Sequence, residues 1–372
     1  MSLFADFERT RRIPFPHRST HFEGLNEVDD PEYAYAREFV GQWFEQVPED
    51  ERADLQARLT SSDDGQHQTA LFELYLNALL LAMGYQVQRH VELGEGRVDF
   101  LALRGGQPVF YLEATSTTLA DEMKKQARAL DDVCDTLNSI HCPDYLLDLF
   151  DYGEHKTTPN LGRLRREVQR WVDGLASASV PMLGGTRESN TLEWEHGDWQ
   201  LEITAWLKPE SLRGDPTCRP LGHQGQPARC IEVGKGVCGA LRSKANRYGD
   251  PGLPYVIAVN MLDDCYRGTD AWHGLLRAWG EPENPRDVHV SAALMCWLPV
   301  AIAAPHETPY LVHHPHALRP LPAEAWRLPQ HRLTAEGPEY RLTTAGLPLL
   351  ENGDRTVAEL LSLKRIRSAS AF

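Results

Sequence analysis

Two acidic residues, Asp99 and Glu113, stand inside short apolar segments whose composition is typical of buried strands. The segments cover residues 97–103 and 108–116, and turn-forming residues separate them. Burying a carboxylate in such a strand is unfavourable unless a metal ion or a hydrogen-bond network compensates its charge. Two carboxylates on neighbouring strands therefore indicate a site for a divalent cation and, with it, phosphodiester chemistry.

The hairpin between the two segments decides whether the carboxylates can meet. The pair Gly105-Gly106 marks its turn. Because side chains alternate between the faces of a strand, Asp99 and Glu113 converge only if the loop has an odd number of residues or if a bulge shifts the register. A three-residue loop from Arg104 to Gly106 would satisfy this condition. A regular two-residue turn would put the carboxylates on opposite faces.

The patterns of the remaining chain predict an α/β fold, since helical and strand segments alternate. We expect helices over residues 31–46, 49–59, 68–84, 119–139, 160–175, 234–248 and 270–279. We expect further strands over residues 85–93, 145–152, 254–260 and 288–297, with a strand pair within 191–207. The chain of 372 residues is long enough for one large domain or two ordinary ones.

Four segments are predicted along the chain. They are an N-terminal arm with helices over residues 1–66, a core over 67–155, an α/β extension over 156–330 that could pack on the same core, and a C-terminal tail over 331–372.

Charge and cysteine usage limit the classes of function. The formal net charge of −15 opposes binding to a polyanion unless a local basic face makes the contact. Three basic clusters are each interpreted first as a solvated helix face: Lys124, Lys125 and Arg128; Arg163, Arg165, Arg166 and Arg170; Arg242, Lys244 and Arg247. Seven cysteines without a Cys-x-x-Cys pair indicate reduced thiols in the cytoplasm. No segment resembles a signal peptide or a membrane span, so no membrane partner is expected.

A third carboxylate, Glu73, stands in the most apolar helical segment of the chain. Glu73 and Asn77 are four residues apart, so they form one short polar stripe on a helix that is otherwise apolar almost all round. Two interpretations remain open. The stripe is either a helix edge that reaches solvent, or Glu73 points along the helix towards the acidic strands.

The order of these elements resembles the PD-(D/E)XK, or restriction-endonuclease-like, nuclease superfamily. The match is a helix with Glu73, a strand, the Asp99 strand, a hairpin, the Glu113 strand and a long helix, and it covers residues 68–152. The resemblance implies a mixed sheet flanked by helices, with an N-terminal helical segment and a C-terminal α/β extension. It further implies that Asp99, Glu113 and the Ala114 carbonyl hold Mg²⁺ or Mn²⁺, with Glu73 as an accessory carboxylate.

The sequence departs from the family pattern at two positions. Val98 replaces a frequent Pro, and Thr115 replaces the Lys that orients the attacking water and offsets developing negative charge. Lys125, followed by Gln126, is one candidate substitute on the next helix. Lys244 is another, although an exposed helix residue is the simpler interpretation of it.

The segment from Lys244 to Tyr248 resembles the Gln-x-x-x-Tyr helix that some members use to support the site and bind phosphate. By the same resemblance, nucleic acid would contact four residues: Thr115, Gln126, Arg247 and Tyr248.

Two hypotheses of function follow. The first is a cytoplasmic Mg²⁺-dependent nuclease that hydrolyses phosphodiester bonds in DNA, in restriction, repair or defence; this setting comes from the resemblance alone. The second is a catalytically inactive module with the nuclease fold that binds a protein partner or nucleic acid. The missing lysine and the acidic composition favour the second hypothesis, and a homodimer is compatible with either.

Overall fold

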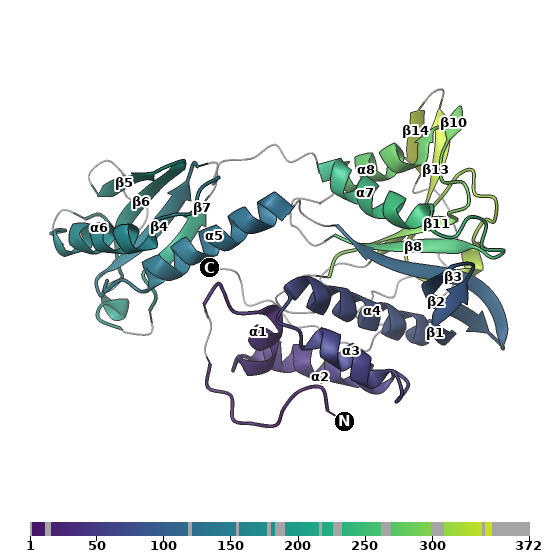
Figure 1. Ribbon diagram of the computed structural model, residues 1–372, viewed down its shortest axis with the longest axis horizontal. Helices are drawn as coiled ribbons and strands as arrows, with labels where there is room; N and C mark the ends of the chain where they lie inside the picture. The colour runs from purple at the N-terminus through teal and green to yellow at the C-terminus, as the bar shows by residue number, and fades with distance from the viewer. Residues whose placement is uncertain are drawn as a thin grey trace. The chain divides into compact units, whose positions relative to one another are not determined.

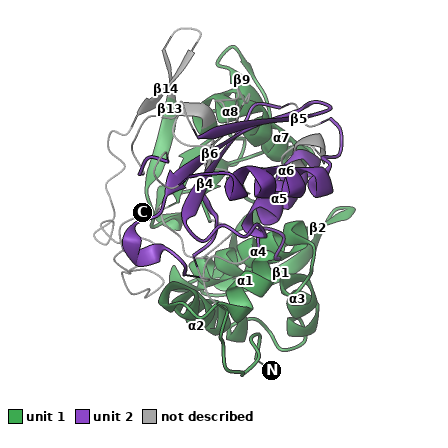
Figure 2. Ribbon diagram, turned by 90° about the vertical axis from the view of Figure 1, so that its left-hand side faces the viewer, with its two compact units in different colours: residues 1–14, 20–118, 232–372 green, residues 15–19, 119–231 purple. Residues whose placement is uncertain are grey.

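The computed structural model describes most of the chain, and Figure 1 shows its helices and strands. The described residues are 2–11, 16–117, 121–153, 156–176, 180–182, 190–215, 218–225, 233–261, 269–298, 309–336 and 339–343. The chain divides into two compact units (Figure 2). Unit 1 consists of residues 1–14, 20–118 and 232–372, and unit 2 consists of residues 15–19 and 119–231.

An eight-stranded mixed sheet forms the centre of the described part of unit 1. Its order is β1-β2-β3-β8-β11-β12-β13-β14. β1, β2 and β3 form an antiparallel meander, and β8 pairs in parallel with both β3 and β11. The bounds are β1 Gln86–Leu93, β2 Gly96–Arg104, β3 Gln107–Ser116, β8 Tyr255–Asn260, β11 Ala292–Cys296, β12 Tyr310–His313, β13 Gln330–Glu336 and β14 Glu339–Thr343. Every residue of β8 and β11 is buried, as expected for central strands enclosed on both faces.

The helices α4 Asp64–Ala82 and α7 Val233–Ala245 flank this sheet, and the other described helices of unit 1 pack on these two or on each other. The bounds of the other helices are α1 His21–Glu27, α2 Pro31–Glu45, α3 Arg52–Leu59 and α8 Thr269–Trp279. α4 packs on β1, β2 and β3, whereas α7 packs on β3 and β8 from the other side (Figure 1). Unit 1 also contains the short pair β9 Gly280–Glu281 and β10 Asn284–Pro285, and a 3₁₀ turn at Ala323–Ala325. The predicted α/β class with a mixed, helix-flanked sheet is therefore confirmed.

α4 is buried over nearly its whole length, because its sequence is apolar on all sides. Asp63 caps its first turn by accepting from the amide of Gly65 at 2.8 Å. The helix ends before Gly84, whose φ of 85° suits a residue without a side chain. The predicted helix over 68–84 thus begins one turn earlier than expected, at Asp64.

Unit 2 contains a four-stranded sheet with order β5-β6-β4-β7 and two helices among its described residues. The bounds are α5 Asp121–Asn138, β4 Tyr145–Asp151, α6 Leu161–Asp173, β5 Thr191–His196, β6 Trp199–Leu207 and β7 Leu221–Gly225, with a 3₁₀ turn at Glu210–Leu212. α5, α6 and one face of the sheet enclose a separate core that includes Leu137, Leu149, Leu164, Val168, Trp194 and Ile203. The amides of His17 and Arg18 both donate to Asp135, which attaches the segment 16–19 to α5.

The two units divide the chain differently from the predicted segments. The predicted core over 67–155 is split at residue 118, and the predicted extension over 156–330 contributes to both units. The predicted tail over 331–372 begins with β13 and β14 of the main sheet, and its residues 344–372 lie outside the described residues. The reason is that β3 pairs with β8, which follows about 140 residues later, and no local pattern specifies such a pairing.

None of the helices in the described ranges combines the length and the apolar character that a membrane crossing requires.

Candidate active site around Asp99 and Glu113

A β-bulge brings Asp99 and Glu113 together. The hairpin turn has two residues, Gly105 and Gly106, with φ of 59° and 76°, and Arg104 pairs with Gln107. The three-residue loop considered from the sequence is therefore wrong. The register shifts next to the turn, where Ala102 pairs with Phe110 but Leu103 pairs with Pro108, so Val109 is the extra residue. Beyond this bulge the pairing continues to Phe100↔Leu112. In this register Asp99 lies opposite Glu113, so their side chains point to the same face of the sheet.

Where the backbone pairing of β2 and β3 ends, an amide of each strand donates to a carboxylate of the other. The amide of Ala114 donates to Oδ2 of Asp99 at 2.8 Å, and the amide of Asp99 donates to Oε2 of Glu113 at 3.3 Å. The Asp99 side chain therefore takes the place of a backbone acceptor opposite Ala114. Because the N–H and C=O of a strand residue point to the same side, the Ala114 carbonyl is directed towards Asp99 as well.

Glu113 is fully buried and is surrounded by donors. Its Oε1 accepts from Lys244 Nζ at 2.8 Å and from Arg247 Nη1 at 2.9 Å. Its Oε2 has weaker partners, namely the Asp99 amide and the Tyr248 hydroxyl at 3.1 Å. That hydroxyl also contacts the Arg97 carbonyl, and its single proton can serve only one acceptor at a time. Oε2 is therefore the Glu113 oxygen with capacity for a further ligand.

The end of α7 positions the cations. Lys244 lies in the last turn, where its charge is favourable to the helix dipole. The Tyr255 hydroxyl, from the buried strand β8, donates to the Lys244 carbonyl at 3.2 Å, and the Tyr248 ring packs edge-on against Tyr255. Gly96 lies under the same ring, since a Cβ at this position would stand 2.9 Å from Tyr248 Cε1. These contacts hold Lys244 and Tyr248 at Glu113.

The charge of Glu113 perturbs its neighbour Asp99. Burial, and secondly the charge of Glu113, raise the pKa of Asp99 to about 7, against the lowering effects of the Ala114 amide and Lys244. Burial and the charge of Glu113 also raise the pKa of Tyr248, so its hydroxyl remains a donor. A pKa of about 7 means that Asp99 can change its protonation state near neutral pH, as carboxylates at functional sites often do.

Glu73 lies apart from this cluster of donors. It is 6 % exposed, so the solvent-edge interpretation is wrong. Arg58 Nη1 and Nη2 donate to its two oxygens at 2.9 and 3.0 Å, and Arg89 Nη2 lies 3.6 Å away. Its charge contributes to the raised pKa of Asp99. Glu73 is thus held by two arginines and acts on Asp99 through its field.

Of the two candidate lysines, the structure brings Lys244 to the carboxylates. Its side chain is 22 % exposed and ion-paired, so the interpretation as an exposed helix residue is wrong. Lys125 and Gln126 belong to α5 in unit 2, where Lys125 is exposed. Thr115 lies on the face of β3 that carries Glu113 and is partly buried.

Sequence reasoning missed Gly96 and Tyr255, the two residues that position Tyr248 and Lys244. No local signal marks either role, because each depends on contacts with α7 or the residues that follow it.

No group of three or more His, Cys, Asp or Glu side chains suited to a metal ion occurs within the described ranges. A cation at this site would therefore depend on the two carboxylates, the Ala114 carbonyl, water and substrate.

Unit 1 is thus an α/β unit whose mixed sheet carries a buried, cation-paired acidic cluster. Comparison of the chain with profiles of protein families, with curated protein sequences and with solved structures found no match in any of the three.

Proposed function

We propose that the protein is a metal-dependent nuclease of the restriction-endonuclease-like class, with DNA as its substrate and Asp99, Glu113 and Lys244 at its centre. The observation that carries this proposal is the 2.8 Å contact between the Lys244 ammonium and Glu113. This lysine supplies, from α7, the cation that the family pattern places at the position of Thr115.

The donor set fits Mg²⁺ or Mn²⁺. Oδ2 of Asp99 is used by the Ala114 amide, which leaves Oδ1 available, and Oε2 is the Glu113 oxygen with spare capacity. Mg²⁺ commonly binds one or two carboxylates and takes its remaining ligands from water and phosphate. A divalent cation would also relieve the repulsion that raises the pKa of Asp99.

Each residue then has a defined task. The ion, when bound, supplies Lewis acidity towards a phosphate oxygen and lowers the pKa of water. Lys244 orients that water and offsets negative charge that develops on the phosphate. Glu113 holds Lys244 in position. The guanidinium of Arg247, 45 % exposed, is available to a non-bridging phosphate oxygen, and Tyr248 supports Glu113 from the opposite oxygen.

Cleavage of plasmid and single-stranded DNA with Mg²⁺ or Mn²⁺ tests the proposal. We expect activity to be lost in Asp99→Ala and Glu113→Ala. Lys244→Met should lower the rate by about a hundredfold or more, because it removes an electrostatic contact to the reacting group. Lys125→Met is the matched control and should retain activity. Cleavage that survives both carboxylate substitutions would refute the proposal.

A rescue experiment separates a catalytic from a structural Lys244. Thr115→Lys, introduced into the Lys244→Met variant, returns the ammonium to the position used in the family pattern. We expect this double variant to recover part of the lost rate. A structural role for Lys244 predicts no recovery, because the contacts at the end of α7 stay broken.

One observation favours the second candidate, an inactive nuclease-fold module that binds nucleic acid. With Asp99 ionised, two carboxylates face two cations, so the cluster is neutral without any metal. This candidate predicts DNA binding that is independent of Mg²⁺ and no cleavage by the wild-type protein under any of the conditions above.

A further inference from the structure

α6 in unit 2 presents arginines on its solvent side. Leu164, Val168 and Val172 of this helix are buried in the unit 2 core. Arg165, Arg166 and Arg170 are all exposed, and within the described residues their side chains make no hydrogen bond or ion pair. We call these three residues the arginine face.

The spacing of the arginine face is unfavourable to the helix, although Arg170 in the last turn is favourable to the helix dipole. Arg166 and Arg170 are four residues apart, a spacing at which like charges destabilise a helix by a few tenths of a kcal/mol. The first turn contains no acidic residue although its amides attract negative charge. Glu167 of the same helix accepts from Arg163 at 2.9 Å, and its carboxylate also interacts electrostatically with Arg170. Helix stability therefore does not account for Arg165 and Arg166, and an external anion does.

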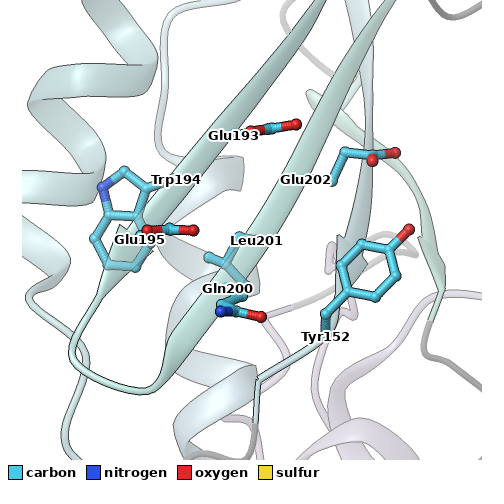
Figure 3. Close-up of a pocket in the computed structure, with 7 residues that line it drawn as sticks. All are labelled: Tyr152, Glu193, Trp194, Glu195, Gln200, Leu201 and Glu202. Carbon is cyan, nitrogen blue, oxygen red and sulfur yellow. The ribbon is translucent and has the colours of Figure 1, made fainter.

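The opposite side of unit 2 carries the opposite charge. Glu193 and Glu202 face each other directly across β5 and β6, and with Glu195 they line a pocket of about 220 Å³ beside Tyr152 (Figure 3). Side chains alternate along β5, so these glutamates point away from the face on which Trp194 packs into the core. Unit 2 thus has exposed arginines on α6 and glutamates on the opposite face of its sheet.

We infer that the arginine face of α6 binds the phosphate backbone of nucleic acid and that unit 2 holds the substrate of the nuclease. The choice of polyanion rests on the proposed function. Guanidinium groups bind phosphate oxygens in pairs, and contacts to phosphates carry no sequence information. Arg166 and Arg170 lie about 6 Å apart along the helix axis, which corresponds to roughly two phosphates of one strand. The glutamates on the other side repel the same polyanion, so binding has one orientation.

The salt dependence of duplex binding tests this inference without requiring cleavage. The full-length protein is titrated in EDTA against a fluorescein-labelled duplex, with anisotropy read at salt concentrations between about 50 and 200 mM. Each phosphate contact contributes about 0.9 to the slope of log affinity against log salt. Arg166→Gln/Arg170→Gln should therefore reduce the slope by about 1.8 and weaken binding roughly sixtyfold at about 0.1 M salt. Gln has nearly the helix propensity of Arg, so α6 should persist, as circular dichroism would verify.

The matched control removes two exposed charges from unit 1, as Arg286→Gln/Arg327→Gln, and should leave the slope unchanged. An equal loss of slope in the control, or an unchanged slope in the α6 variant, overturns the inference while the proposed function stands. Wild-type protein that binds phosphatidylserine vesicles but no duplex also overturns it. If the α6 variant has a reduced salt slope but the wild-type protein never cleaves DNA, the result supports phosphate binding by the arginine face and contradicts only the proposed nuclease activity.

Discussion

Replacing Asp99 with Asn should stabilise unit 1 at neutral pH. Asp99 lies beside the buried Glu113, and burial and this neighbouring charge raise its pKa to about 7. Asn carries no charge, yet its side-chain oxygen can still accept from the Ala114 amide as Oδ2 of Asp99 does. The substitution therefore removes the repulsion and keeps the contact.

The magnitude follows from linkage. The pKa of Asp99 rises from 3.8 to about 7 on folding, a shift whose upper limit is about 4 kcal/mol at 1.4 kcal/mol per pKa unit. Below about pH 4 the side chain of Asp99 is protonated in both the folded and the unfolded state, so it does not reduce the stability of the fold. The loss of folding stability caused by ionised Asp99 grows between about pH 4 and pH 7 and is constant above pH 7. After allowance for the partial exposure of the side chain, we expect the variant to gain about 1 to 3 kcal/mol at pH 8 and close to nothing at pH 4.

Hydrogen exchange of peptides from β2 and β3, followed as a function of urea, measures this gain. It reports the opening of unit 1 alone, whereas whole-chain unfolding of a two-unit protein is not a two-state transition. Asp250→Asn is the opposite control, because Arg319 and the Gly252 amide lower the pKa of Asp250 to about 2. A gain that is absent at pH 8, or equal at both pH values, would refute the reasoning about the acidic pair.

Three further predictions concern the same cluster. Glu113→Gln should destabilise unit 1 by about 2 to 4 kcal/mol in the same exchange assay, because it leaves two cations at the end of α7 without their anion; no loss would contradict the assigned ion pairs. Mg²⁺ affinity measured by calorimetry should fall about tenfold per pH unit below pH 7, since Asp99 must lose its proton to bind the ion, and a pH-independent affinity would contradict this. Gly96→Ala should displace Tyr248 and lower the cleavage rate, whereas Gly41→Ala, which has no atom within 4 Å of its new Cβ, should not.

Part of the candidate site was predictable from local sequence. Apolar runs interrupted by Asp99 and Glu113 predicted two buried acidic strands, and the structure has β2 and β3 there. The requirement that a bulge or an odd loop must unite the carboxylates was also predictable, because alternation along a strand is a property of its backbone. Local sequence could not predict whether the odd loop or the bulge occurs. The two-residue glycine turn and the bulge at Val109 both depend on how the two strands pair.

Glu73 and Lys244 illustrate the limit of local patterns. The sequence shows Glu73 on an apolar helix, but its environment depends on Arg58 and Arg89, which come from other elements. Lys244 stands more than 130 residues after Glu113, and its exposure could not be inferred from its own helix.

The sequence by itself determined the α/β class, the acidic strands and the apolar helix α4, because these follow from hydrophobic periodicity and turn residues over short distances. Only the tertiary structure decided that β8 lies against β3, that α7 and the residues after it thereby bring Lys244 and Arg247 to Glu113, and that residues 119–231 form a separate unit. Contacts between distant segments depend on the packing free energy of the whole chain, and many pairings are compatible with the same local pattern.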